Sequence, residues 1–435
     1  MLRHLLARGF EAVVLDTRPA RQVDAVDAEF RWDVQQWPRL TVDFAVVSPG
    51  LSMDHALVAG AADAGVALVS DIDLFFDAVQ APVIGVTGTN GKSTVTALAG
   101  HLLNSSGIST GVGGNLGVAA LDLLDERHQC YVLELSSFQL ERSLEQPFHA
   151  ATVLNISEDH LDKHGDMHHY VQAKQRIYAR AERRIYNRMD PLTLPTPATG
   201  ALSFGADMPP SEADWGITAA AAGSQSSRVL VRGETSLCPV ESLPLHGAHN
   251  ELNVLAACAL VDTHLDFTQM REALASFAGL PHRFELVDEL EGVQYINDSK
   301  ATNLGATLAA LSGMAATEQV ILIAGGDAKG VDLAPLAQVL EGRVRHVFTI
   351  GQDGPQVAAV AADCGVAHSA CDGLRDAVSA AYAAARPGDS VVLSPACASL
   401  DMFDNYMQRG ECFAKSVRRL RRAGSGGVES RGDVG

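Results

Sequence analysis

A glycine-rich segment carries the clearest chemical signal in the sequence. It reads Val83-Ile-Gly-Val-Thr-Gly-Thr-Asn-Gly-Lys-Ser-Thr94, an apolar run followed by glycines, a lysine and hydroxyl residues. Glycines let backbone N–H groups turn inward around phosphates, and the helix that follows adds positive potential at its start. The Lys92 ammonium could reach the β- and γ-phosphates of a nucleotide, and the Ser93 hydroxyl could bind Mg²⁺. We therefore predict a phosphate loop formed by Gly88, Thr89, Asn90, Gly91, Lys92, Ser93 and Thr94.

The match to the usual phosphate-loop pattern is not strict. Val86 stands where that pattern has a glycine, five residues before the Gly-Lys pair. A glycine-rich connection with a chance lysine is the alternative. The apolar run before the loop and the helical pattern after it favour phosphate binding.

A single carboxylate interrupts the next apolar run. The run is Tyr131-Val-Leu-Glu-Leu-Ser-Ser137, and Glu134 is its one charged residue. A buried charge is costly without a partner, so a cation should face it. Either Mg²⁺ on the ATP phosphates or a structural arginine could do so. We favour the metal because the run follows a phosphate loop.

Polar residues crowd the end of a third apolar run, Ala151-Thr-Val-Leu-Asn-Ile-Ser-Glu-Asp-His-Leu-Asp-Lys-His164. Polar groups at the carboxyl end of a strand mark the ligand crevice of open α/β sheets. The neutral imidazole of His160 could bind a metal there. We expect His164, His168 and His169 to be ordinary loop histidines. Lys174 lies in a predicted amphipathic helix over residues 170–178, where a lone lysine is normally solvated.

These segments belong to an alternating pattern of short β-branched runs and Ala/Leu-rich helical stretches. Strands buried on both faces of a parallel sheet have such a composition, and the alternation predicts an α/β fold. A helix is expected over residues 95–103, directly after the phosphate loop. The expected strands are residues 11–15, 44–47, 83–87, 131–135, 151–156, 320–324, 347–350 and 390–393.

Composition divides the chain into three domains and a tail. We expect a Rossmann-like domain over residues 1–71 and a central P-loop ATPase domain with a parallel sheet over residues 72–280. A Pro/Ala/Ser-rich stretch at residues 191–227 should be irregular or edge structure. A C-terminal Rossmann-like domain follows over residues 281–420, and residues 421–435 form a disordered tail.

Charge and cysteine content exclude several classes of protein. The chain has 435 residues and a net charge of −19, which argues against nucleic-acid or membrane-surface binding. Seven cysteines without a C-x-x-C pair suggest neither a zinc site nor a disulfide framework. There is no apolar stretch of about 18 residues, and we recognise no signal peptide. We expect a cytoplasmic monomer.

In order and spacing, these residues resemble the Mur ligases, ATP-dependent amide-forming enzymes of peptidoglycan synthesis related to folylpolyglutamate synthetase. The resemblance extends to about residue 420. It rests on Gly88-Thr-Asn-Gly-Lys-Ser-Thr94, Glu134, Asn155-x-x-x-Asp-His-x-Asp162, Lys174 and Gly247-Ala-His-Asn-x-x-Asn253. Four further strings resemble the branch that adds D-glutamate: Gly279-Leu-Pro-His-Arg-Phe-Glu285, Asn297-Asp-Ser-Lys-Ala-Thr-Asn303, Gly325-Gly-Asp-x-Lys329 and Leu393-Ser-Pro-Ala-Cys-Ala-Ser-Leu-Asp-Met-Phe403.

The resemblance implies an enzyme that joins D-glutamate to UDP-N-acetylmuramoyl-L-alanine. ATP would first convert the muramoyl carboxylate into an acyl phosphate, which the amine of D-glutamate then attacks. Three substrates held by separate domains imply that the domains close during the reaction. Lys92 would act on the phosphates. The implied ligands of two Mg²⁺ ions are Ser93, Glu134, His160 and a carbamylated Lys174.

The resemblance also implies substrate contacts in each domain. Asn250, Arg283 and Asp298 would contact ATP. The residues implied around D-glutamate are Lys300, Thr302, Lys329, Ser399, Leu400 and Tyr406, the last at a position where the family more often has phenylalanine. The residues implied around the UDP-muramoyl group are Asp16, Thr17, Arg18, Ser48, Pro49, Gly50 and Asn115.

The first residues depart from the family. Its members begin with an additional strand and a Gly-rich loop that contacts the UDP diphosphate, whereas residues 1–9 here resemble the helix after that loop. We expect a true start upstream of Met1, or else a first domain with weaker UDP binding and lower stability. The alternatives for function are a folylpolyglutamate synthetase-like ligase, a non-catalytic sensor of UDP-muramoyl nucleotide, and a simple kinase.

Overall fold

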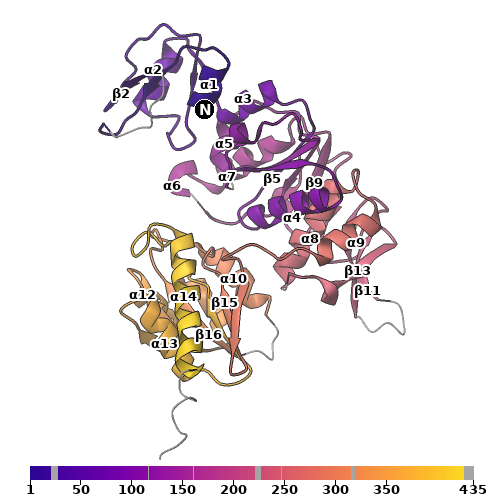
Figure 1. The fold of residues 1–435 in the computed structure, drawn as a ribbon, viewed down its shortest axis with the longest axis vertical. Coiled ribbons are helices and arrows are strands. Elements are labelled where there is room, and N and C mark those ends of the chain that lie inside the picture. The colour runs from indigo at the N-terminus through magenta and orange to yellow at the C-terminus, as the bar shows by residue number, and fades with distance from the viewer. Residues whose placement is uncertain are drawn as a thin grey trace, which may run out of the picture. The chain divides into compact units, whose positions relative to one another are not determined.

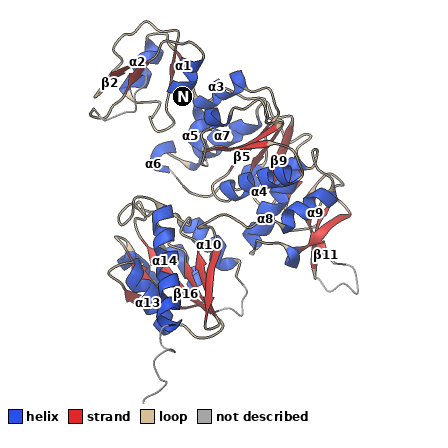
Figure 2. Ribbon diagram, viewed as in Figure 1, coloured by secondary structure: helices blue, strands red, loops and turns tan. Residues whose placement is uncertain are grey.

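The protein is described by a computed structural model with an α/β fold (Figures 1 and 2). The chain divides into two compact units. The first comprises Met1–Ser242 and Leu252–Phe277, and the second comprises Leu243–Glu251 and Ala278–Gly435. The structure describes residues 1–20, 28–115, 117–159, 161–220, 227–245, 247–314 and 319–425.

A nine-stranded sheet forms the centre of the first unit, in the order β13-β12-β11-β10-β9-β8-β5-β7-β6. Neighbours from β6 to β11 are parallel, and β12 and β13 continue the sheet as antiparallel strands. The Pro/Ala/Ser-rich stretch at residues 191–227 supplies β10 and β11 towards that end of the sheet. The strands are β5 (Val83–Thr87), β6 (Thr110–Gly114), β7 (Cys130–Glu134), β8 (Ala150–Val153), β9 (Arg183–Asn187), β10 (Leu202–Phe204), β11 (Trp215–Ala219), β12 (Arg228–Arg232) and β13 (Thr235–Pro239).

Capping side chains mark where several helices of this unit begin. Ser70 and Asp73 form a capping box at α3, and Ser136 and Gln139 form another at α5. The Asp166 carboxylate accepts a hydrogen bond from the His169 N–H at the start of α7. The helices are α3 (Asp71–Ala78), α4 (Lys92–Ser105), α5 (Ser137–Arg142), α6 (Leu161–His164), α7 (Met167–Gln175), α8 (Ala248–Val261) and α9 (Phe267–Ala275), with 3₁₀ turns at Ala120–Leu123, Arg176–Tyr178, Pro191–Thr193 and Val240–Ser242.

The first 70 residues form smaller and less buried elements. Strand β1 pairs in parallel with β2, and β3 pairs in parallel with β4, as two two-stranded sheets. Helix α1 has no buried residue. Two-stranded sheets are marginal on their own, so this region has little internal support. The elements are α1 (Leu2–Ala7), β1 (Val13–Leu15), β2 (Glu29–Arg31), β3 (Phe44–Val46), α2 (Ala56–Asp63) and β4 (Ala67–Val69).

The second unit is built on a six-stranded sheet in the order β14-β15-β19-β16-β17-β18. All neighbours are parallel except β14 and β15. The strands are β14 (Glu285–Leu290), β15 (Val293–Asn297), β16 (Gln319–Gly325), β17 (Val344–Ile350), β18 (Ala367–Ala370) and β19 (Asp389–Leu393). The helices are α10 (Leu304–Ser312), α11 (Ala337–Leu340), α12 (Gly354–Asp363), α13 (Leu374–Ala384) and α14 (Tyr406–Ser425), with a 3₁₀ turn at Ala334–Leu336.

Both faces of this second sheet are covered by helices. Val320 and Leu322 of β16 pack in a cluster with residues of α10, α11 and α12. Ile321 and Ile323 point the other way, into a cluster with residues of α13 and α14. Alternation along a strand places successive side chains on opposite faces, so an uninterrupted apolar run fills both cores.

The expected strands and helices are present, with shifted ends. The strand predicted at residues 151–156 ends at Val153, and residues 154–156 begin the polar loop. The helix predicted at residues 170–178 is α7 followed by a 3₁₀ turn. The tail was expected from residue 421, but α14 continues through Ser425, since Arg and Ala sustain a helix. Residues 426–435 lie outside the described residues.

The seven cysteines, all within the described residues, are free thiols. No described helix is both long enough and apolar enough to cross a membrane.

Candidate active site

The predicted catalytic segments meet at one edge of the nine-stranded sheet. Strand β5 lies between β7 and β8, and all three are parallel. Each strand ends at this edge: β5 runs into the phosphate loop, β7 ends at Glu134, and β8 precedes the polar loop. Ligands of open α/β sheets bind at the carboxyl ends of strands. The sheet order thus brings together segments that are up to about 70 residues apart in the sequence.

The two glycines of the phosphate loop are required by close contacts. Gly88 has φ +151°, and a Cβ atom there would lie 3.0 Å from Cβ of Leu154. Gly91 has φ +82° and precedes α4; a Cβ atom there would lie 2.4 Å from Oδ1 of Asn253. Side chains at either position would push the loop off its neighbours, so the backbone path depends on glycine.

Hydrogen bonds tie the phosphate loop to the polar loop after β8. The Asn90 N–H donates to Oδ1 of Asn155 at 2.8 Å, and Nδ2 of Asn155 donates to the Asn90 carbonyl at 3.0 Å. Thr89 Oγ1 accepts from the Ser157 N–H at 3.1 Å and lies 3.1 Å from the Tyr170 hydroxyl. The loop is therefore preorganised by partners in the loop after β8 and on α7.

Two lysines converge on one carbonyl oxygen of the phosphate loop. Lys92 Nζ donates to the carbonyls of Gly88 and Thr89 at 2.9 and 2.7 Å, and Lys174 Nζ donates to the Gly88 carbonyl at 2.8 Å. The side chain of Lys174 is almost fully buried, at 1% exposure. The interpretation of Lys174 as a solvated surface residue is therefore wrong. Its position, four residues after Tyr170, places it on the face of α7 that covers the sheet.

The surroundings of Lys174 favour the neutral amine. Burial, and then the nearby Lys92 ammonium, hold the pKa of Lys174 well below its usual range, although Asp159 and Glu134 act in the opposite direction. The ring of Tyr170 lies 4.5 Å from Nζ and would interact favourably with a cation. We give more weight to burial because an amine at 1% exposure has lost nearly all its hydration.

Glu134 has the environment of a metal ligand. The residue is 3% exposed, and its Oε1 accepts a hydrogen bond from Nδ2 of Asn115 at 2.7 Å. Its Oε2 is buried without a hydrogen-bond partner among the described residues. No arginine of the described chain forms an ion pair with it, so the structural-arginine alternative has no support there. An orphaned buried carboxylate oxygen fits a site for Mg²⁺.

The structure describes only some of the remaining predicted metal ligands. Ser93 is buried in the first turn of α4. His160 lies outside the described residues. In the part of the chain that is described, no three His, Cys, Asp or Glu side chains are arranged to hold a metal by themselves. The predicted donor set is mixed, with a hydroxyl and a modified lysine beside Glu134.

The residues predicted around D-glutamate gather at the carboxyl ends of β15, β19 and β16 in the second unit. Lys300 Nζ lies 4.4 Å from the centre of the Tyr406 ring. The Asp327 N–H donates to the Ala398 carbonyl, which ties the Lys329 loop to the segment that holds Ser399. The Lys329 backbone has φ +54°, and its N–H donates to Oδ1 of Asp327 at 2.8 Å. Ser399 is buried, Thr302 is partly exposed, and Leu400 is 69% exposed.

Two of the predicted ATP contacts, Arg283 and Asp298, are neighbours in the second unit. The Asp298 carboxylate accepts hydrogen bonds from the Ser394 hydroxyl at 2.9 Å and the Phe284 N–H at 3.2 Å. Burial raises the pKa of Asp298 to about 7, and the nearby Arg283 guanidinium acts against this rise. Asn250 is buried near the start of α8.

A buried arginine that the sequence interpretation missed supports both glutamate segments. Arg409 of α14 is 1% exposed and donates to the Ser299 carbonyl at 2.8 Å, the Cys397 carbonyl at 3.1 Å and the Ala398 carbonyl at 3.2 Å. Burial lowers its pKa to about 10. Tyr170 was missed as well, and Asn253 was quoted only as the last residue of a family motif, without a role of its own. Spacing was a further signal, since each of the three lies three or four residues from a predicted site residue on the same helix.

The residues predicted to bind the UDP-muramoyl group are distributed over both small sheets. The segment of Asp16, Thr17 and Arg18 follows β1, and Arg18 forms a bidentate ion pair with Asp16 at 2.9 and 2.7 Å. Ser48, Pro49 and Gly50 follow β3, which belongs to the other two-stranded sheet. Arg142 Nη2 donates to the Leu51 carbonyl at 2.7 Å, which attaches this second segment to α5.

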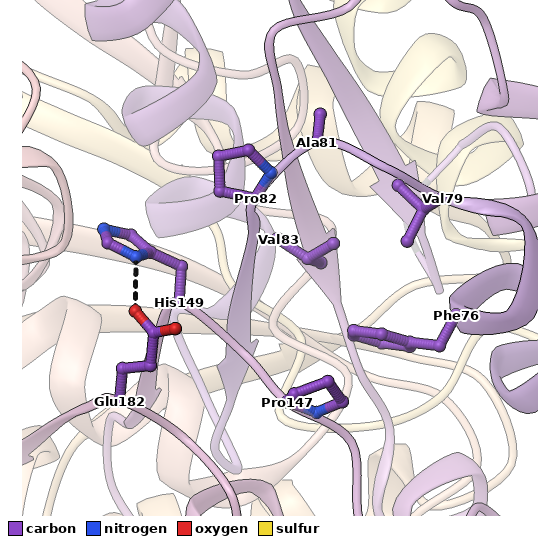
Figure 3. A pocket seen from close by; sticks show the side chains of 8 residues that line it. All are labelled: Phe76, Val79, Ala81, Pro82, Val83, Pro147, His149 and Glu182. Carbon is purple, nitrogen blue, oxygen red and sulfur yellow. Dashed lines mark hydrogen bonds and ion pairs between the residues drawn. The ribbon is translucent and has the colours of Figure 1, made fainter.

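A hollow of about 190 Å³ has none of the predicted site residues in its lining (Figure 3). It is lined mainly by apolar side chains, and His149 Nδ1 lies 2.9 Å from Oε2 of Glu182 beside it. Its residues precede β5, β8 and β9, so it lies at the amino ends of the strands. Open α/β sheets bind ligands at the other end, so we do not assign the reaction to this hollow.

Comparison with known proteins agrees with this geometry. The Mur ligase middle domain family matches residues 86–261, and the glutamate ligase domain family of Mur ligases matches residues 282–397. The first match contains the phosphate loop, Glu134 and Lys174, and the second contains Asp298, Lys300 and Lys329. The chain belongs to the Mur ligase family.

Several curated relatives of the chain carry the name UDP-N-acetylmuramoylalanine–D-glutamate ligase. The chain is 43% identical to the protein of that name from Legionella pneumophila strain Philadelphia 1, over 86% of this chain and 85% of the relative. It is 40% identical to the Shewanella oneidensis protein over 97% and 95% of the two chains. The Escherichia coli K12 protein is 42% identical over 95% and 94%.

Several solved structures share the fold. UDP-N-acetylmuramate–alanine ligase MurC from Thermotoga maritima aligns with a TM-score of 0.62 at 17% identity, over 97% of this chain and 96% of that one. MurF from Acinetobacter baumannii aligns with a TM-score of 0.60 at 20% identity, over 95% and 86%. Escherichia coli FolC aligns with a TM-score of 0.57 at 19% identity, over 81% and 92%.

Proposed function

We propose that this protein joins D-glutamate to UDP-N-acetylmuramoyl-L-alanine at the expense of ATP, as a cytoplasmic monomer in peptidoglycan precursor synthesis. The observation that carries the proposal is the buried Lys174 amine, which shares the Gly88 carbonyl with Lys92 beside the orphaned oxygen of Glu134. A protein that only bound nucleotide would have no use for a second buried lysine there. The names of the relatives support the choice of substrates.

The proposed roles in the first unit follow from charge. A muramoyl carboxylate and the γ-phosphate of ATP repel each other, and Mg²⁺ held by Ser93, Glu134, His160 and Lys174 would screen that repulsion. Lys92 and the loop N–H groups bind the phosphates. Lys174 serves a metal only as a carbamate, which forms from a neutral amine and CO₂. Its burial supplies the neutral amine.

The proposed roles in the second unit concern ATP and the incoming amino acid. Arg283, Asp298 and Asn250 bind the nucleotide. Lys300 and Lys329 receive the two carboxylates of D-glutamate, and Ser399, Thr302, Leu400 and Tyr406 complete its surroundings. The amine of D-glutamate then attacks the acyl carbon, the new C–N bond forms, and phosphate leaves.

The UDP-muramoyl group is assigned to the first 71 residues and to Asn115. Because Asn115 donates to Glu134, we propose that it links substrate contact to the orientation of the carboxylate. We also propose that the three domains meet near residues 71 and 280.

Phosphate release tests the proposal directly. The purified chain is incubated with ATP, Mg²⁺ and UDP-N-acetylmuramoyl-L-alanine, with D-glutamate, L-glutamate or no amino acid. Release that requires both the nucleotide substrate and D-glutamate, with the product mass of the amide, is the expected result. Release or phosphate transfer without D-glutamate would indicate a kinase. Nucleotide binding without release would indicate a non-catalytic sensor.

A further inference from the structure

His164 is a buried residue in a segment where the sequence suggested an ordinary loop histidine. It is the last residue of the short helix α6 and is 8% exposed. Among the described side chains of α6, Leu161 is partly exposed and Lys163 is exposed. Among the described side chains of α6, His164 is thus the one that is buried.

The contacts of His164 reach two other helices. Its Nε2 lies 2.9 Å from the Ser137 hydroxyl oxygen, a buried contact. Its ring stacks on Phe138, with centroids 5.0 Å apart and planes 9° apart. On α7, the Tyr170 ring lies 5.2 Å from it with a 50° tilt. A polar contact and two ring contacts fix both the position and the rotation of the imidazole.

Each of these partners lies beside a proposed metal ligand. Ser137 begins α5, three residues after Glu134. Tyr170 lies one turn before Lys174 on α7, and its ring faces the Lys174 amine. Helix α6 itself begins one residue after position 160. Figure 1 shows α5, α6 and α7 as separate short helices of the first unit.

We propose that His164 is a positioning residue for the metal-binding edge of this unit. By holding α5, α6 and Tyr170 to one another, it sets the spacing of the segments that carry Glu134 and Lys174. Partners one step removed from metal ligands commonly change metal affinity or activity by about 10- to 100-fold when they are lost. The inference rests on the proposed function, because it assumes that these segments bind Mg²⁺.

Two substitutions of His164 test its polar contact and its ring stacking separately. His164→Phe keeps an aromatic ring for stacking but cannot bond to Ser137. His164→Gln places an amide nitrogen near the position of Nε2 but gives up the stacking. Ser137→Ala removes the same polar contact from the other side. His168→Ala is the matched control, because His168 is an exposed histidine on α7.

The measurement is the Mg²⁺ concentration that gives half-maximal D-glutamate-dependent phosphate release by the full chain, with other substrates saturating. We expect His164→Phe and Ser137→Ala each to raise it by about tenfold, and the double variant to raise it no further. The KM for D-glutamate should stay within about twofold. His164→Gln should recover part of the loss, and His168→Ala should match the wild type.

The experiment distinguishes failure of the proposed function from failure of the positioning role of His164. If the wild-type chain shows no D-glutamate-dependent release, the proposed function fails. If the wild type is active and His164→Phe has an unchanged Mg²⁺ requirement, the positioning role is overturned, even if that variant unfolds at a lower temperature. Additive effects of His164→Phe and Ser137→Ala would also overturn it, because the two residues would then act separately.

Discussion

Replacing Lys174 by methionine should separate stability from activity. Methionine has a similar length and no amine, so it can fill the same buried space. The substitution removes one hydrogen bond to the Gly88 carbonyl, which contributes about 1 kcal/mol net. It also removes a buried amine and its repulsion with Lys92, which offsets that loss. We expect the free energy of unfolding to change by no more than about 1 kcal/mol.

Activity should respond far more strongly. If the carbamate of Lys174 holds a Mg²⁺ ion in the transition state, its loss removes about 3–4 kcal/mol of stabilisation. Since about 1.4 kcal/mol corresponds to a factor of ten, D-glutamate-dependent phosphate release should fall by about 100- to 1,000-fold. Lys163→Met provides the control, because Lys163 is an exposed lysine on α6.

The second part of this test measures how activity depends on CO₂. Wild-type activity should fall in buffer stripped of CO₂ and return when bicarbonate is added, while Lys174→Met should respond to neither treatment. The urea midpoint of each variant is measured alongside phosphate release. The reasoning is refuted if Lys174→Met keeps more than about a tenth of the activity. It is also refuted if activity is lost only in proportion to unfolded protein.

Three further predictions concern other parts of the chain. Arg409→Met leaves the Ser299 and Cys397 carbonyls without the Arg409 donor and leaves the Ala398 carbonyl with the Asp327 N–H alone, so it should destabilise the second unit by about 2–4 kcal/mol in urea unfolding; it should also raise the KM for D-glutamate more than that for the UDP-linked substrate, and equal increases would contradict its support of the glutamate segments. Burial raises the pKa of Asp298 from 3.8 to about 7, so the folded chain keeps a proton that the unfolded chain has lost. Stability should therefore fall as pH rises across that range, by up to about 4 kcal/mol, and Asp298→Asn should flatten this dependence of the thermal midpoint; an unchanged slope would contradict the assignment. Backbone amides of β1 to β4 should exchange with solvent before those of β5, because two-stranded sheets open readily, and equal protection of all these strands would be the opposite result.

Much of the fold could be predicted because local patterns agree with tertiary structure. The apolar run at residues 320–324 is buried on both faces of a parallel sheet, so its composition alone indicates its place. Strand ends were less predictable. Residues 154–156 are apolar or amide-bearing and continue the pattern of β8, yet they leave the sheet. Asn155 bonds to Asn90 of the phosphate loop, and the Ile156 N–H donates to Asp190.

The candidate site was predictable where backbone geometry demands particular residues, as at Gly88 and Gly91. It was not predictable where a side chain is buried by distant segments. Lys174 and His164 have ordinary surface types and spacings. They are buried only because α7 places Lys174 against the phosphate loop and because α5 and α7 enclose His164. The family resemblance supplied a role for Lys174, but nothing in the sequence indicated His164.

The order of strands in the second unit has a consequence for how the chain is made. Strand β19 comes last in the sequence but lies between β15 and β16. During synthesis, β15 and β16 therefore each keep one unpaired edge, on the side of β19, until nearly the whole chain has left the ribosome. Exposed strand edges favour association with other chains. A message that ends before β19 would thus yield an aggregation-prone product rather than a smaller folded protein.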